Sequence, residues 1–235
     1  MNYAMQETDD PTGRLFDASR GCAVFSQRLL RFTGSSDFAG SGERVDLSSD
    51  EVLYVLAGTG TLVIDEVEHE LAPGTAAFVE PGKSWSIAGA DDLSILSVLV
   101  HDPEPATSAS AVVDLAASER QSATAGRQFV LGAGPAHGCA SVTQFIGLIP
   151  PGRAPDHFHT YDEVIYVLEG EGFLEIAGEQ APLQRGSCIH LPARLVHCLA
   201  NTGTTEMRVL GVFRPAGSPA EAYYPDGTRA LLKRS

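Results

Sequence analysis

The chain of 235 residues carries 30 acidic and 16 basic side chains, so its formal net charge is −14 and its pI is about 4.8. Such a surface repels nucleic acid phosphates and anionic membranes, so we expect a small molecule or another protein as the partner. Apolar residues make up 43% of the chain, and the length allows one or two domains with a substantial core.

The cysteines and the chain start both favour a cytoplasmic protein. The four cysteines form neither a CxxC pair nor a dense framework, so we expect reduced thiols. Residues 1–14 are polar and acidic without an apolar centre, so we expect a mobile arm there and not a secretory signal. Because no stretch of about 18 apolar residues occurs, no membrane span is expected.

Short apolar runs punctuated by Gly-x-Gly and Pro-Gly turns are typical of an all-β chain built from hairpins. They form one block over residues 15–104 and a second over 127–217. Residues 105–126, rich in Pro, Ser and Ala at their start, are expected to be a linker, and residues 218–235 a C-terminal arm.

The two blocks are copies of one unit. Moving the first by 112 positions (163 − 51) places it over the second without gaps from Glu51 to Gly74. Glu51 then meets Glu163, and Gly58 meets Gly170. Glycines at matching places predict the same turns in both copies.

A candidate metal site lies in the second block. His157 and His159 are two residues apart, so on an extended strand both side chains leave the same face. Glu163 keeps that parity and opens the next strand, while His197 follows Pro192 and enters from a third segment. Imidazoles with one carboxylate suit a divalent ion such as Fe, Mn, Ni, Zn, Co or Cu and leave positions open for water, substrate or dioxygen.

These residues resemble the two motifs of the cupin superfamily. Gly152, His157, His159, Glu163 and Gly170 match the first motif, and Gly186, Pro192, His197 and Asn201 match the second. Arg194 stands where the second motif usually has a glycine. The resemblance implies a bicupin of two tandem jelly-roll barrels (double-stranded β-helices), with the metal ligands pointing into the second barrel.

The first block departs from this pattern. Val45, Leu47 and Trp85 stand where the second block has its three histidines, and only Glu51 remains. A single carboxylate does not hold a metal tightly, so we expect a metal-free barrel in which Glu51 pairs with a basic group or stays solvated.

Other side chains are candidates for the pocket lining. His190 and Cys188 precede His197 and could orient ligands from a second layer. Tyr161 and Gln144 are the remaining candidates.

Three functions stay open. The resemblance to quercetinase-like dioxygenases, which share the three-histidine, one-glutamate set, favours an oxygenating enzyme in which Glu163 is a ligand or the catalytic base. A redox-neutral hydrolase, isomerase or decarboxylase is the second hypothesis, because ureidoglycine aminohydrolases have a similar architecture but a different ligand order. A non-catalytic binding protein is the third. The resemblance is compatible with a homodimer, and the acidic surface does not decide between monomer and dimer.

Overall fold

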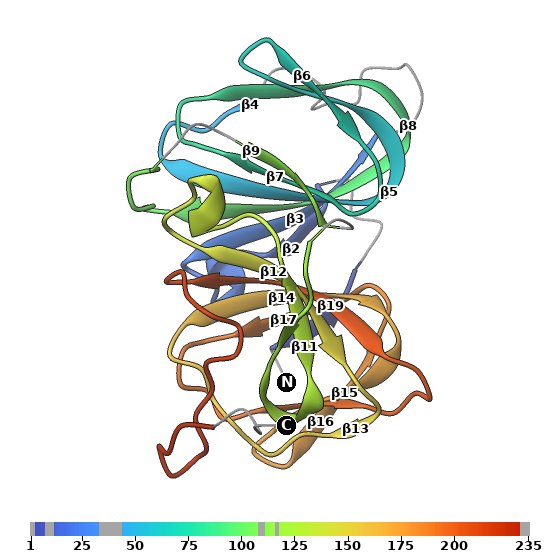
Figure 1. Cartoon of the computed structure of the whole chain (residues 1–235), viewed down its shortest axis with the longest axis vertical. Coiled ribbons are helices and arrows are strands. Elements are labelled where there is room, and N and C mark those ends of the chain that lie inside the picture. The colour runs from blue at the N-terminus through green and yellow to red at the C-terminus, as the bar shows by residue number, and fades with distance from the viewer. Residues whose placement is uncertain (1–2, 8–11, 33–43, 108–110, 116–117, 231–235) are drawn as a thin grey trace. The chain divides into compact units, whose positions relative to one another are not determined.

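The computed structural model describes residues 3–7, 12–32, 44–107, 111–115 and 118–230, and its regular elements are almost all strands (Figure 1). The helical segments in these ranges are short 3-10 turns: η1 (Ala18–Arg20), η3 (Thr124–Gly126) and η4 (Pro135–His137). None of the helices described is long and apolar enough to cross a membrane. The all-β fold class is therefore confirmed.

The chain divides into two compact units. The N-terminal unit comprises Thr8–Ser118 and Gly132–Val142, and the C-terminal unit comprises Met1–Glu7, Glu119–Leu131 and Thr143–Ser235. Each unit is described by itself below.

The N-terminal unit is built on one sheet with the order β2-β3-β8-β5-β7-β9, to which β4 and β6 are added by pairing with β8 and β5. Its core is a cluster of aliphatic and aromatic side chains that includes Leu53, Leu62 and Trp85. The strands are β2 (Arg14–Phe16), β3 (Phe25–Phe32), β4 (Arg44–Val45), β5 (Ser49–Ile64), β6 (Val67–Leu71), β7 (Thr75–Val79), β8 (Ser84–His101) and β9 (Ala111–Asp114).

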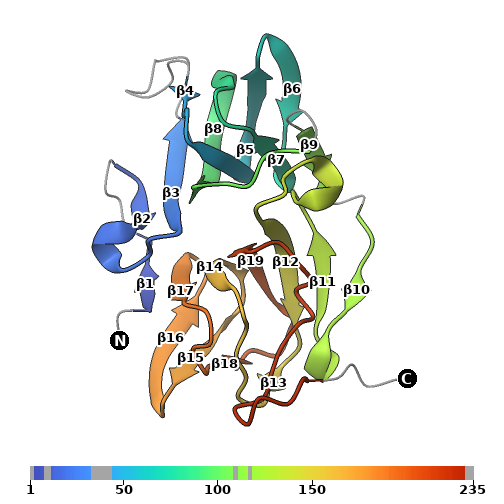
Figure 2. The ribbon, with the colours of Figure 1, turned by 90° about the vertical axis from the view of Figure 1, so that its left-hand side faces the viewer.

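The C-terminal unit has two sheets, ordered β1-β17-β14-β19-β12-β11-β10 and β13-β18-β15-β16 (Figure 2). Leu174 and Leu199 from the smaller sheet share one core with Ile165, Ile189 and Val209 from the larger sheet. The strands are β1 (Ala4–Gln6), β10 (Gln121–Ser122), β11 (Gln128–Leu131), β12 (Thr143–Ile149), β13 (Gly152–Arg153), β14 (Asp162–Glu169), β15 (Glu171–Ile176), β16 (Glu179–Gln184), β17 (Ser187–Leu191), β18 (Cys198–Asn201) and β19 (Met207–Arg214).

The repeat is visible in the strand pairing. β5 pairs with β7 and β8, and its counterpart β14 pairs with β17 and β19. Gly58 and Gly170 both have positive φ, +74° and +95°. A Cβ would lie 2.3 Å from the Asp92 carbonyl oxygen at Gly58 and 2.9 Å from Met207 Cα at Gly170. The same turn therefore requires glycine in both copies.

Segments expected to be arms and linker contain ordered structure. The polar arm predicted over residues 1–14 holds β1, which pairs with β17, and β2. Tyr166 donates a hydrogen bond to the Glu7 carboxylate, which fixes the chain just after β1. Within residues 105–126, β9 pairs with β7 and β10 pairs with β11. Edge strands satisfy backbone groups that a free linker would leave to water.

Candidate metal centre

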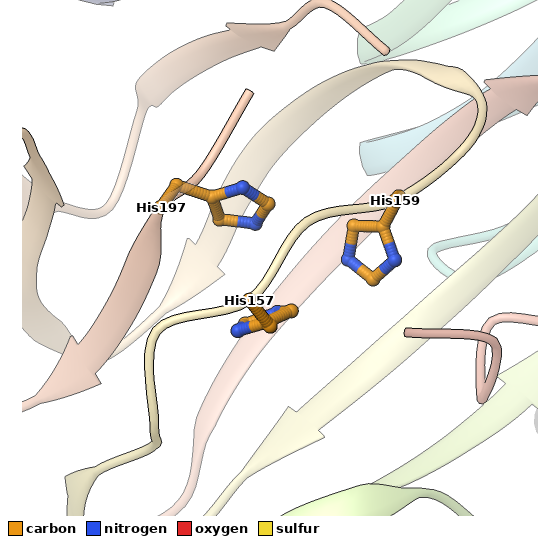
Figure 3. A group of neighbouring side chains, drawn as sticks. All are labelled: His157, His159 and His197. Carbon is orange, nitrogen blue, oxygen red and sulfur yellow. The ribbon is translucent and has the colours of Figure 1, made fainter. Parts of the chain in front are cut away.

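Three histidines meet in the C-terminal unit (Figure 3). His157 and His197 form an isolated antiparallel bridge, in which each backbone N–H donates to the other's carbonyl oxygen at 3.0 and 2.8 Å. His159 follows two residues later, so its side chain reaches the same space. One ligand nitrogen from each ring lies within 4.8 Å of the others, which is close enough for one metal ion.

The outer nitrogen of each ring is tied to a backbone carbonyl. Nδ1 of His157 lies 3.0 Å from the Pro155 oxygen, and Nδ1 of His197 lies 2.9 Å from the Leu195 oxygen. Nδ1 of His159 lies 2.7 Å from the Glu221 oxygen. A carbonyl only accepts, so each Nδ1 carries the proton and each Nε2 keeps its lone pair.

The His197 Nε2 atom decides whether the residues fit a metal. It is buried and has no hydrogen-bond partner in the described parts of the chain. A buried polar atom without a partner is costly unless something else binds it. Three neutral imidazoles with free Nε2 atoms are a donor set for Zn, Fe, Ni, Cu or Co, so the residues fit such an ion.

Burial keeps the three rings neutral. It lowers the pKa of His157 to about 4 and that of His159 to about 3, and in His159 the neighbouring His157 adds to the effect. Burial, His157 and His159 lower the pKa of His197 well below its usual value. The rings are therefore ready to bind metal at neutral pH without first losing a proton.

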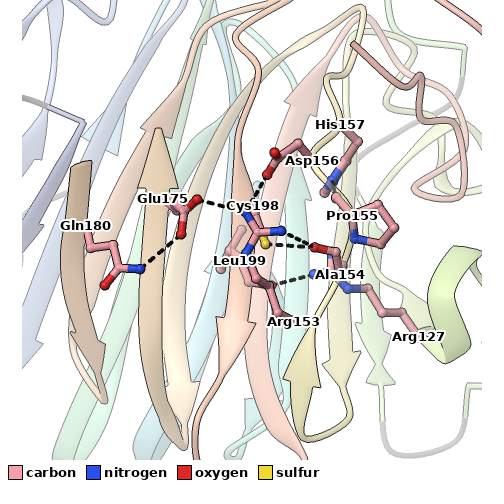
Figure 4. Close-up of polar contacts among 10 residues, drawn as sticks. All are labelled: Arg127, Arg153, Ala154, Pro155, Asp156, His157, Glu175, Gln180, Cys198 and Leu199. Atoms are coloured by element: carbon pink, nitrogen blue, oxygen red, sulfur yellow. Dashed lines mark hydrogen bonds and ion pairs between the residues drawn. The ribbon is translucent and has the colours of Figure 1, made fainter. Parts of the chain in front are cut away.

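The segment that carries His157 is braced (Figure 4). Arg153 forms ion pairs with Asp156 at 2.7 Å and with Glu175 at 2.8 Å. The buried thiol of Cys198 donates to the Ala154 oxygen at 3.1 Å. These contacts hold both sides of the bridge between His157 and His197, which limits the spread of ligand positions.

Glu163 begins β14 and is buried beside the same cavity. Its Oε1 lies over Gly211, where an added Cβ would come within 3.0 Å of it. Burial raises the pKa of Glu163 to about 8, and the nearby Arg127 opposes this shift. Glu163 is not in the group of ligand atoms within 4.8 Å, so its roles as fourth ligand and as catalytic base stay predictions.

The histidines and Glu163 line a cavity with about 600 Å³ of empty space, part of which is open to solvent. Tyr161, one of the candidate lining residues, also lines it. Its ring is buried and stacked between His159 and Phe213, at centroid distances of 4.7 and 4.0 Å. The two stacked rings therefore enclose Tyr161.

The other candidate lining residues lie outside the lining of this cavity. Ile189 and Leu191 of β17 pack into the core, so Cys188 and His190, which alternate with them along the strand, point to the opposite face. Gln144 on β12 also points away from the cavity, because its neighbour Phe145 lines the cavity and successive side chains of a strand point to opposite faces. All four cysteines of the chain are buried and free, as expected for reduced thiols.

Two parts of the site come from residues outside the two cupin motifs, so the motifs did not predict them. The C-terminal arm supplies the Glu221 carbonyl to His159, and Pro219 and Ala222 to the cavity wall. Arg127, immediately before β11, places a cation in the same cavity.

The matching place in the N-terminal unit holds a hydrogen-bonded carboxylate where the C-terminal unit has its histidine cluster. Glu51 is buried, and its carboxylate accepts hydrogen bonds from Trp85 Nε1, at 2.7 Å, and from Ser97. The expectation that Glu51 pairs with a basic group or is solvated is therefore wrong. Val45 and Leu47, at the places of the other two histidines, are 50% and 80% exposed. They offer no ligand atom.

The cupin domain family matches this chain twice, over residues 41–99 and 145–213. These two matches cover more than half of the sequence. The chain belongs to the cupin family. It is a bicupin whose C-terminal cupin carries the histidine cluster.

Among curated proteins, the chain is similar to a gentisate 1,2-dioxygenase from Ralstonia sp., with 35% identity over 113 residues. That alignment covers 44% of this chain and 32% of the dioxygenase, so the chain spans about a third of that relative's length.

Among solved structures, the chain resembles AerE from Microcystis aeruginosa, with a TM-score of 0.71, 13% identity and coverage of 91% of this chain and 99% of AerE. It also resembles an oxalate decarboxylase mutant from Bacillus subtilis, with a TM-score of 0.68, 13% identity and coverage of 90% and 77%. At these identities the likeness shows the bicupin fold alone.

Proposed function

We propose that this bicupin is a metal-dependent dioxygenase that acts on a small molecule in the cavity of its C-terminal cupin. The observation that carries the proposal is the buried, unpartnered His197 Nε2 at the centre of a cluster whose Nδ1 atoms are all fixed by carbonyls. The similarity to gentisate 1,2-dioxygenase supports oxygen chemistry over other cupin reactions.

His157, His159 and His197 would hold the ion, and Glu163 would complete the set or stay beside it. A bound divalent metal would supply Lewis acidity and, if it is iron, manganese, nickel or copper, a centre through which electrons can pass from the substrate to dioxygen. Glu163 can exchange a proton with a substrate hydroxyl in the cavity, because burial brings its pKa close to the neutral range.

The surrounding residues would orient the substrate and exclude water. Phe145, Ile149 and Leu199 give the cavity apolar walls, and Tyr161 stacks on His159 so that this ring cannot rotate freely. A substrate with two oxygen donors, such as an enediol or a hydroxylated aromatic compound, could approach the metal through the positions that three histidines leave open. The quercetinase-like activity implied by the family resemblance is one member of this class.

The test is oxygen consumption by protein reconstituted with each of Fe, Mn, Ni, Co, Cu and Zn, with enediols and hydroxylated aromatics as candidate substrates. We expect consumption with at least one redox-active metal and none in His159→Ala. Stoichiometric metal binding without oxygen consumption for any pair would contradict dioxygenase activity and favour redox-neutral chemistry. A ligand that stabilises the protein equally with and without chelator would favour a binding protein.

A further inference from the structure

Arg127 is a cation held in place inside the metal cavity. Its Nη2 donates a hydrogen bond of 2.6 Å to the carbonyl oxygen of Leu199, two residues beyond His197 on β18 (Figure 4). Its side chain is partly buried, and it lines the same cavity as the three histidines. The guanidinium is therefore fixed relative to the strand that follows a metal ligand.

This guanidinium has spare donors. It carries five N–H groups, of which the bond to Leu199 uses one. No carboxylate in the described ranges lies within the 4.0 Å of an ion pair with Arg127, and Glu163 is the only acidic residue in the cavity lining. Arg153, on the outside of the same unit, shows the contrast, since Asp156 and Glu175 both pair with it.

The rest of the cavity favours a ligand that brings its own negative charge. Most of the lining is apolar, including Phe129, Phe145, Ile149 and Val209. In such surroundings a guanidinium binds a carboxylate through strong, often bidentate, charge-assisted hydrogen bonds. Among the described residues of the lining, Arg127 is the one Lys or Arg, and its single charge matches that of one carboxylate.

We infer that Arg127 is the anion-binding group of this cavity, and that the substrate is a small carboxylic acid whose hydroxyl or oxo oxygen faces the three histidines. This inference rests on the proposed function in so far as it takes the same cavity to be the catalytic one. It narrows the substrate class from any enediol or polyphenol to compounds that carry a carboxylate.

The test measures probe binding by calorimetry in the presence of zinc, which lacks redox chemistry, so that no turnover disturbs the measurement. The probes are 2-hydroxybenzoate with 2-hydroxybenzamide, and lactate with lactamide. In each pair a neutral amide replaces the carboxylate at similar size. We expect the wild type to bind the acid of at least one pair about ten- to a hundredfold more tightly than its amide.

Substitution of Arg127 separates binding from structure. In Arg127→Gln the acid-to-amide ratio should fall to about one, and Arg127→Lys should keep part of it. If Arg127 only supported Leu199, its loss would weaken acid and amide alike and leave the ratio unchanged. Circular dichroism and zinc content check that both variants fold and keep the histidine site.

Two results would overturn the inference: no preference for the acid in either wild-type pair, or a ratio that Arg127→Gln leaves unchanged. Oxygen consumption is measured separately. Protein that consumes no oxygen but keeps an Arg127-dependent preference contradicts the dioxygenase proposal alone. Protein that consumes oxygen without this preference contradicts only the role of Arg127.

Discussion

Trp85 Nε1 donates a hydrogen bond of 2.7 Å to the carboxylate of Glu51. Moved by 112 positions (197 − 85), these two residues fall on His197 and Glu163 of the second cupin. The N-terminal cupin thus has a carboxylate at the same place as the second cupin, but a hydrogen-bond donor where the second cupin has a candidate metal ligand. An indole N–H only donates, so it satisfies Glu51 in place of an ion.

Trp85→Phe should destabilise the protein by about 1.5–3 kcal/mol, because it leaves a buried carboxylate with one donor fewer. Urea denaturation measures the change in the free energy of unfolding. In a double-mutant cycle, Trp85→Phe should lower the free energy of unfolding by less in the Glu51→Met background than in the wild type. Unchanged stability in Trp85→Phe, or a loss of metal from the protein, would contradict this account of the N-terminal cupin.

Stability of the metal-free protein should depend on pH through the histidine cluster. The pKa of His157 is about 4 in the folded chain against 6.5 when unperturbed. Between these values the unfolded state binds more protons, so stability falls as the pH falls, by on the order of 1 kcal/mol per pH unit for each such histidine.

Glu163 acts in the opposite direction. Its pKa is raised from 4.5 to about 8, so the folded state binds more protons between these values and its contribution grows as the pH falls. Three histidines outweigh one carboxyl group, so net stability should decrease from pH 6.5 to 4.5. In urea melts with chelator, Glu163→Gln should steepen this decrease and His159→Ala should flatten it. Equal slopes in all three proteins would refute the assignment.

The C-terminal arm should tune metal affinity. Glu221 accepts the hydrogen bond from His159 Nδ1, and Tyr223 pairs and stacks with Phe158. Ending the chain at Gly217 removes both contacts and should weaken metal binding about ten- to a hundredfold. Tyr224→Ala changes an exposed residue of the same arm and is the matched control. Equal affinities of the truncated and full chains, by competition with a chromogenic chelator, would count against this role.

Arg194→Gly should stabilise the protein. Arg194 has φ of +66°, and its backbone N–H donates to the His159 oxygen at 2.7 Å. A left-handed conformation costs a non-glycine residue about 1–2 kcal/mol, and glycine avoids this cost. Glycine also gives the unfolded chain more conformational freedom, which lowers the free energy of unfolding by about 0.4–1 kcal/mol. The expected net gain, at most about 1.6 kcal/mol (2 − 0.4), can be read from urea melts. Glu179→Gly on the exposed face of β16 should instead lower stability, and a loss in Arg194→Gly would contradict the strain argument.

Local patterns were enough to predict the repeat and the histidine cluster. The turns and the ligand positions depend on residues only a few positions apart, so their spacing can be read from the sequence. Gly58 and Gly170, for example, adopt positive φ at the matching turn of each copy. His190 was harder to place, because all five residues of β17 are buried and the usual alternation between the two faces disappears.

Contacts that join distant segments could not be predicted in this way. Glu221 lies 62 positions from His159, and it contributes a backbone carbonyl, which any residue possesses. The repeat gives no sign of Arg127, because the residue 112 positions earlier (127 − 15) is the uncharged Leu15. Both depend on the path of the folded chain.

Metal analysis by mass spectrometry tests the central claim most directly, on protein purified without a metal-affinity column. Wild type and His69→Ala, a histidine change in the N-terminal cupin, should each hold roughly one equivalent of a divalent transition metal. His159→Ala should hold far less. If the wild type contains no metal and takes none up on reconstitution, or if His159→Ala keeps its full complement, His157, His159 and His197 are not a metal site.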